Sequence, residues 1–200
     1  MFRLVTSLIV LSFFVSQPAF ADDHGSDFAQ YNVSVSGSPF GGSLNFAYNE
    51  SPKTSWFFAL GGLPGLELEQ DIDGTAYTVD GSSSWVGFFI NHRPLENADW
   101  FRLVAGIGIG TIENELKDEN GNRYSANYKE NPVGYLGIGF GSRALKGLQL
   151  GLDIGWLQTS GPQVKQIAGD DNAEALTSIS DHFLFGSALP NVQFTAGWGF

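Results

Sequence analysis

Hydrophobic residues alternate with small or polar residues along much of the chain. In 101–109 every second position is Phe, Leu, Ala or Ile, and the positions between hold an arginine, a valine and two glycines. The same alternation recurs in 136–141 and 148–156. A period of two is typical of β-strands with two different faces. After residue 21 no segment has the roughly 18 consecutive apolar residues of a membrane-spanning helix, which excludes helical spans.

Turn-like segments and longer polar segments separate these strands in a regular order. The short turns lie at 50–53, 93–97 and 144–147, and the longer segments, rich in Asp, Glu, Asn and Gly, lie at 70–80, 113–128 and 161–175. The short turns recur about every 45–50 residues, which is the scale of two strands and one loop. Tight turns at one end and long polar loops at the other are typical of transmembrane barrels.

The spacing predicts eight strands. They run over 28–36, 41–49, 54–68, 76–92, 99–113, 128–143, 147–160 and 177–200. An even number places both chain ends on the side of the tight turns, as such barrels require. Leu189-Pro190-Asn191 also has the composition of a turn, which would give nine strands. We expect one long last strand instead, because proline is tolerated at a bulge or at the outer end of a strand.

The less apolar face of each strand is too small and too sparsely charged to face water. We expect it to line a narrow lumen, with the apolar face toward lipid. A soluble, lipocalin-like barrel would instead place the apolar face inward. Buried charges are normally paired, and strand parity therefore predicts a polar lumen network of Arg102, Tyr135, Gln149 and Asp153. The expected fold is an all-β, eight-stranded, antiparallel up-and-down transmembrane β-barrel with short periplasmic turns and longer extracellular loops.

The first 21 residues have the pattern of a cleaved signal peptide. Arg3 precedes an apolar stretch, and Ala19 and Ala21 form a small-x-small cleavage site. The predicted mature domain is 22–200. The whole chain has 10 basic and 21 acidic residues. Cleavage removes one arginine, leaving 9 basic against 21 acidic residues and a net charge of −12. Binding to nucleic acid depends on basic residues, so nucleic acid is not an expected partner.

The last strand has the most specific pattern. Its outward face is predicted to hold Val192, Phe194, Ala196, Trp198 and Phe200. Other aromatic residues near predicted strand ends are Tyr48, Trp56, Trp85, Trp100 and Trp156. Aromatic rings at strand ends suit the membrane interface, where they form girdles.

The signal peptide, the eight alternating strands and the terminal aromatic-x-Phe resemble small outer-membrane barrels of the OmpA, OmpX and OmpW kind. The stretch 181–200, with Pro190 inside it, is similar to the last strand of OmpW-like proteins. The resemblance implies location in the outer membrane of a Gram-negative bacterium, contact with lipids and lipopolysaccharide, and recognition by the barrel assembly machinery. The assembly signal would be Val192, Phe194, Trp198 and Phe200. The resemblance transfers no activity.

Candidate chemistry is sparse. The chain has no cysteine, which excludes disulfides and thiolate metal sites. Its three histidines are His24, His92 and His182, and His182 lies near Ser178 and Ser180 without the local His-x-Ser pattern of outer-membrane lipid A deacylases. The segments 71–74 and 118–122 resemble fragments of calcium loops but lack the full ligand spacing. We therefore expect acidic, solvated loops and no metal, cofactor or catalytic residues.

Three functions remain open from the sequence. The first is a structural or surface-interaction protein whose polar lumen is filled by side chains. The second is a narrow channel or binding barrel for small solutes, apolar ones included, since eight strands enclose little more than side chains or one small ligand. The third, and least favoured, is a lipid-modifying enzyme.

Overall fold

Eight strands form a closed antiparallel ring. The computed structural model describes residues 27–129, 132–170 and 172–200. In ring order the strands are β1 (Tyr31–Ser38), β2 (Gly41–Asn49), β3 (Thr54–Ile72), β4 (Thr75–His92), β5 (Phe101–Asp118), β7 (Val133–Gly141), β8 (Gly147–Gln158) and β10 (Ala188–Gly199). β10 pairs back onto β1 and closes the ring. The prediction of an eight-stranded barrel is confirmed. The predicted signal peptide with Ala19 and Ala21, and also His24, lie outside the described residues.

The apolar face of the ring points outward. Val35, Ile107, Leu136, Leu148 and Phe194 are each 60–69% exposed. Polar residues on the opposite face, among them Asn32, Ser34, Ser36, Arg102 and Asp153, are less than a tenth exposed. The predicted assignment of faces is confirmed, and a lipocalin-like barrel with an apolar interior is contradicted. Within the described ranges, no helix is long and apolar enough to cross a membrane.

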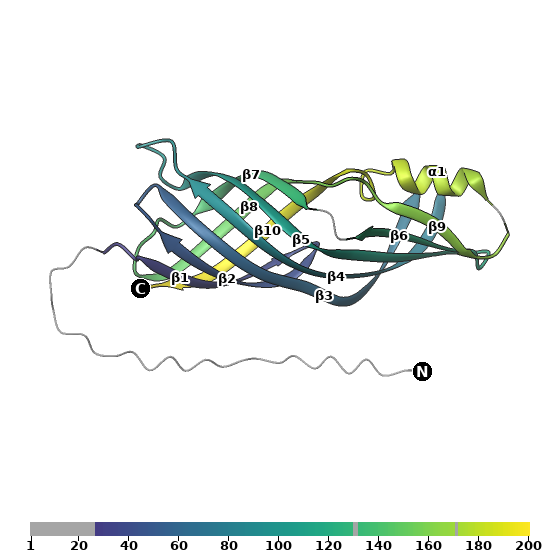
Figure 1. Ribbon diagram of the computed structural model, residues 1–200, viewed down its shortest axis with the longest axis horizontal. Coiled ribbons are helices and arrows are strands. Elements are labelled where there is room, and N and C mark those ends of the chain that lie inside the picture. Colours follow the sequence, from purple (N-terminus) through teal and green to yellow (C-terminus); the bar gives the residue numbers. More distant parts are fainter. Residues whose placement is uncertain (1–26, 130–131, 171) are drawn as a thin grey trace.

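The two ends of the ring differ in length. At one end, which we call the turn end, short connections join β2 to β3, β4 to β5 and β7 to β8. At the other, the loop end, β3, β4 and β5 continue past the ring, as Figure 1 shows. There β6 (Arg123–Lys129) replaces β7 beside β5, and β9 (Gln163–Ala168) pairs with β6.

This extension packs around a small core of its own, which together with its strands we call the loop-end module. Helix α1 (Ala173–Asp181) lies against β6 and β9 (Figure 1). Its Ala175 and Ile179, one turn apart, are buried against the sheet. The residues of this core are Ile72, Tyr77, Val79, Leu116, Tyr124, Ala126, Ala175, Ile179 and Phe185.

The prediction of polar loops at 70–80, 113–128 and 161–175 is wrong for most of these residues. The β3–β4 connection is only a two-residue turn, in which Asp73 and Gly74 have positive φ and Asp71 Oδ1 accepts the Gly74 N–H at 3.0 Å. On these strands Asp71, Asp80 and Glu115 are each next to a buried residue of the loop-end core and lie on the other face, whereas Asp118 is itself buried. In these segments the acidic composition therefore indicates one face of a sheet and not a loop.

Two predicted strands are also divided. The expected strand 128–143 is β6 and β7, with Pro132 between them, which cannot donate to a ladder. The expected strand 177–200 begins as α1, and only 188–199 is a strand. The helix follows an N-cap at Asn172, whose side chain accepts the Ala175 N–H at 3.0 Å.

Pro190 lies inside β10 opposite Trp156, so the nine-strand alternative is wrong. Phe200 and Tyr31 exchange both backbone hydrogen bonds. Since such pairs alternate along an antiparallel ladder, even-numbered residues of β10 point their backbone groups toward β1. β1 pairs with β10 only as far as Phe194. Pro190 therefore faces an edge where no donor is needed, which explains why the strand tolerates it.

Leu116→Ala tests the core of the loop-end module. Leu116 is fully buried there, and its truncation should destabilise the module by about 2–5 kcal/mol. Limited proteolysis of the refolded protein should then cut the module faster while the ring stays intact. Ile167→Ala, at a half-exposed position of β9, is the matched control. Equal cleavage rates for the two variants would contradict this core.

Candidate functional site

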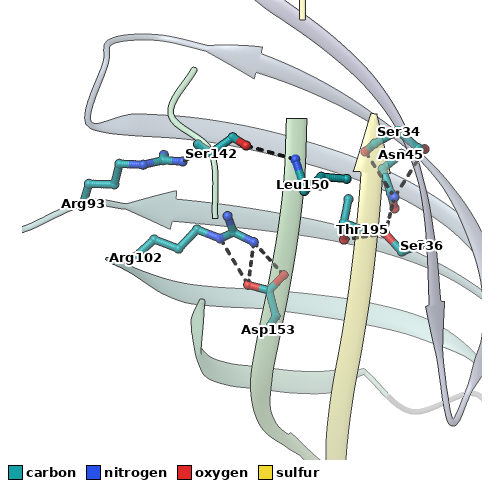
Figure 2. Close-up of polar contacts among 9 residues, drawn as sticks. All are labelled: Ser34, Ser36, Asn45, Arg93, Arg102, Ser142, Leu150, Asp153 and Thr195. Carbon is teal, nitrogen blue, oxygen red and sulfur yellow. Dashed lines mark hydrogen bonds and ion pairs between the residues drawn. The ribbon is translucent and has the colours of Figure 1, made fainter. Parts of the chain in front are cut away.

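An ion pair lies along the inner wall of the ring. Arg102 of β5, Gly139 of β7 and Asp153 of β8 occupy one row of the sheet. Arg102 reaches across Gly139, and its Nη2 donates to Asp153 Oδ2 at 2.8 Å and to Oδ1 at 2.9 Å, while Nε donates to Oδ1 at 3.1 Å. Both side chains are buried. Figure 2 shows the pair between the two strands.

Gly139 gives this ion pair its space. A β-carbon at this position would overlap Asp153 Oδ1 and Arg102 Nε. A β-carbon at Gly151, in the next inward row of β8, would lie 2.8 Å from Arg102 Nη2. The Arg102 side chain therefore lies close to the backbone of two glycines, whose missing β-carbons leave room for it in a narrow barrel.

The large lumen side chains are placed by the same rule. Each lies against glycines of its own or a neighbouring strand at which a β-carbon would come too close to it. These sets are Tyr135 over Gly137 and Gly155, Phe89 over Gly87 and Gly106, and Trp85 over Gly61 and Gly110. The indole of Trp85 lies inside the ring and donates to the Phe40 carbonyl at 3.1 Å. The prediction that Trp85 belongs to an interfacial girdle is wrong.

The opposite part of the lumen holds small polar side chains. Asn45 Nδ2 donates to Ser36 Oγ at 2.8 Å, and Ser36 Oγ lies 2.8 Å from Thr195 Oγ1 (Figure 2). Asn32 Nδ2 donates to Gln149 Oε1 at 3.0 Å. These bonds join β1, β2, β8 and β10, so they tie the seam of the ring together from inside.

Backbone and side-chain contacts join neighbouring segments at the turn end. The segment before β1 bridges to the β7–β8 connection through Phe28 and Leu145. Asn49 Nδ2 donates to the Ala29 carbonyl at 2.6 Å. Arg93, in the β4–β5 connection, donates to the carbonyls of Asp99 and Ser142. Burial, reinforced by the charge of nearby Arg102, lowers the pKa of Arg93 to about 10, so it remains a cation at neutral pH.

A narrow cavity of about 170 Å³ remains inside the ring. Its lining extends from Arg93 and Ala144 at the turn end to Thr111 and Ser160 at the loop end. This volume is enough for several water molecules. It is smaller than the roughly 300 Å³ at which small-molecule pockets begin.

The structure places the four predicted network residues in different settings. Arg102 and Asp153 are paired, whereas Gln149 contacts Asn32 and donates to the Leu145 carbonyl at 2.6 Å. Tyr135 makes no hydrogen bond to the other three. The sequence interpretation missed the Asn45–Ser36–Thr195 cluster, although these residues occupy alternate positions of strands whose other face is apolar. That alternation was the available signal.

The remaining candidates do not converge on a reactive site. His182 follows α1 and its Nδ1 contacts the Leu184 N–H at 3.4 Å, while Ser180 Oγ donates to the Thr177 carbonyl. His92 Nδ1 lies 3.1 Å from Thr54 Oγ1. In the calcium-like segment 118–122, the Asp118 carboxylate accepts two bonds from Asn122. No metal-binding group of three or more His, Asp or Glu occurs among the residues that the structure describes.

The predicted assembly-signal residues line the outer face of β10 and the chain end. Val192, Phe194, Trp198 and Phe200 are 41–65% exposed. The ring of Tyr31 packs beside Phe46, Tyr48 and Phe200 at the turn end. These aromatic residues surround the seam where β10 meets β1. Their recognition by an assembly machinery stays a prediction.

Solved structures share this architecture. The chain is similar to Acinetobacter baumannii CarO, with a TM-score of 0.66 and 16% identity over 86% of this chain and 98% of the other. It is similar to Acinetobacter baumannii CarO2, with a TM-score of 0.70 and 14% identity over 86% of this chain and 99% of the other. Both neighbours are outer-membrane β-barrel proteins. At these identities the likeness shows the fold alone. No protein-family model and no curated protein sequence matches the chain.

Gly139→Ala tests the packing of the ion pair. The added methyl group would overlap the Arg102–Asp153 pair, and such overpacking costs about 1–3 kcal/mol. The urea midpoint of the refolded barrel, followed by tryptophan fluorescence, should fall. Gly37→Ala is the control, because a β-carbon there would meet nothing within 4 Å. A Gly139→Ala midpoint as high as that of Gly37→Ala would rule out this packing.

Proposed function

We propose that the protein is an integral outer-membrane β-barrel of the surface-interaction type. Its ring would anchor it in the outer membrane of a Gram-negative bacterium, in contact with lipids and lipopolysaccharide. The loop-end module would face the exterior. A closed ring suits a bilayer because each strand of it has a partner on both sides, and paired backbone groups can lie in hydrocarbon.

The outward face supports the membrane anchor. In β8 the outward residues Leu148, Leu150, Ile154 and Trp156 are 38–65% exposed. In water, an exposed apolar band around the whole ring would be far larger than the patches of a soluble monomer. A span of about 9–11 residues crosses the hydrocarbon core as a tilted strand, and the 12-residue strands β8 and β10 have that length.

The single observation that carries the surface-interaction role is the Arg102–Asp153 pair in a filled lumen. The pair and the rings of Tyr135, Phe89 and Trp85 occupy the interior that a channel would need. The loop-end module extends beyond the ring and has exposed acidic side chains, among them Glu67, Glu69 and Asp73. This arrangement supports a role for that module in contacts with other molecules and not a role in bulk transport.

A narrow channel is the second candidate. The cavity lining extends along the ring from Arg93 to Ser160, which favours a path for water or very small solutes. A lipid-modifying enzyme has less support, because His182 Nδ1 contacts the Leu184 N–H and Ser180 Oγ donates to the Thr177 carbonyl, so that neither is directed at the other. The similarity to the CarO structures concerns the barrel fold and indicates no chemical activity for this chain.

Single-channel recording in planar bilayers separates the two candidates. We expect the wild-type protein to show no resolved conductance steps. The double variant Arg102→Ala with Asp153→Ala removes the side chains that cross Gly139 and should produce small steps. Heat-modifiable migration on gels is the control for a folded barrel. Stable steps from the wild type would favour the channel and contradict the filled lumen.

A further inference from the structure

One strand of the loop-end module has an open edge. The β1–β2 hairpin turns at Pro39 and Phe40, and β2 therefore pairs with β3 only as far as Gly62. β3 continues to Ile72 beside β4 alone. After residue 62, no other described strand lies on its second side. The side chains of 64–69 are all exposed, so this edge is open to solvent.

The register determines which backbone groups are free. The Arg93 N–H donates to the Lys53 carbonyl, so residues 53 and 93 form a hydrogen-bonded pair. Because such pairs alternate along an antiparallel ladder, the backbone N–H and C=O groups of the odd-numbered residues of β4 point toward β3. The pairing of β4 with β5 has no register shift, whereas the pairing of β3 with β4 shifts by one residue between Leu63 and Leu66. Beyond this shift, even-numbered residues of β3 bond to β4. The backbone N–H and C=O groups of Glu67 and Glu69 therefore point to the open edge.

The side chains of the open edge alternate in character. Leu66 and Leu68 lie on the inner face and are 46% and 58% exposed. Glu67 and Glu69 lie on the outer face. From Leu63 to Asp73 the chain has four acidic residues and no basic one.

The outer face also has an unbalanced row of like charges. Glu67 lies opposite Asp80, and Asp80 lies opposite Glu115. Arg123 pairs with Glu115, but among the described residues no cation pairs with Glu67 or Asp80. Like charges directly opposite one another are destabilising in a sheet. A basic residue beside Glu67 would relieve this repulsion.

We propose that the open edge of β3 binds an extended peptide strand in which basic residues alternate with apolar ones. The peptide backbone pairs with the free groups of Glu67 and Glu69, as in other cases of strand addition. Its basic side chains lie beside the two glutamates, and its apolar side chains cover Leu66 and Leu68. The partner is thus a cationic, amphipathic β-strand.

A second copy of the chain fits this edge poorly. In an antiparallel pair with matched faces, odd-numbered residues lie opposite odd-numbered residues. If two copies pair about any central residue from 67 to 71, acidic residues of one copy lie directly opposite acidic residues of the other copy or opposite its Gly65. Charged residues on edge strands commonly prevent self-pairing in this way.

The inference rests on the proposed function, since it names the surface that would make contacts outside the membrane. It is tested with a fluorescent synthetic peptide of alternating lysine and valine, added to the refolded protein in non-ionic detergent. Fluorescence anisotropy should rise on binding, and the affinity should fall with salt. The same peptide with every backbone nitrogen methylated has equal charge but cannot donate to the open edge, and it should not bind.

Two variants separate backbone pairing from charge. Glu69→Gln removes one charge, and Glu69→Pro removes the same charge together with the free N–H, without touching the β4 ladder. We expect Glu69→Pro to bind the lysine–valine peptide about tenfold more weakly than Glu69→Gln, which corresponds to the loss of one hydrogen bond. Heat-modifiable migration confirms that each variant is folded.

Several outcomes would overturn the inference. These are equal affinity for the two Glu69 variants, binding of the N-methylated peptide as tight as that of the unmethylated one, no binding at all, or a dimer of the protein without peptide in sedimentation. If Glu69→Pro fails to fold, the comparison of the two peptides on the wild type decides alone. Failure of the outer-membrane anchor would appear separately, as a protein that is soluble without detergent.

Discussion

The limited interior of an eight-stranded ring is the constraint on which the rest of the structure depends. Such a ring has just enough room for side chains, and not every inward position can carry a large one. Large residues are therefore placed beside glycines of adjacent strands, as Arg102 and Asp153 are beside Gly139. The ion pair is costly to bury, and three hydrogen bonds between the partners compensate part of that cost. The barrel is consequently a packed domain with a narrow residual cavity.

Unequal strand lengths account for the second half of the molecule. β1 and β2 have 8 and 9 residues, whereas β3, β4 and β5 have 18 or 19. The long strands need partners beyond the ring, and β6, β9 and α1 supply them on one side. On the other side β3 has none. The loop-end module and the open edge therefore have the same origin in the short β1–β2 hairpin.

Much of the ring can be predicted from the sequence, because a period of two specifies which side chains share a face. The inward position of Arg102 and Asp153 follows from parity alone. Their contact does not, since it depends on the register that places Gly139 between them. Trp85 was misplaced for the same reason: its position inside requires Gly61 and Gly110 on neighbouring strands. Helix α1 was missed because nine residues containing Thr177, Ser178 and Ser180 have weak helix propensity, and burial of Ala175 and Ile179 decides the fold there.

Quenching by brominated lipids tests the central claim, that the apolar face meets lipid and the lumen is filled from within. The chain has 5 tryptophans, so variants that keep one and replace the others by phenylalanine report on single positions. In vesicles, Trp156 and Trp198, which are 59% and 50% exposed on the outer face, should be strongly quenched. Trp85, inside the ring, should be nearly unaffected. Quenching of Trp85 as strong as that of Trp198, or no quenching at any of the three, would contradict the account.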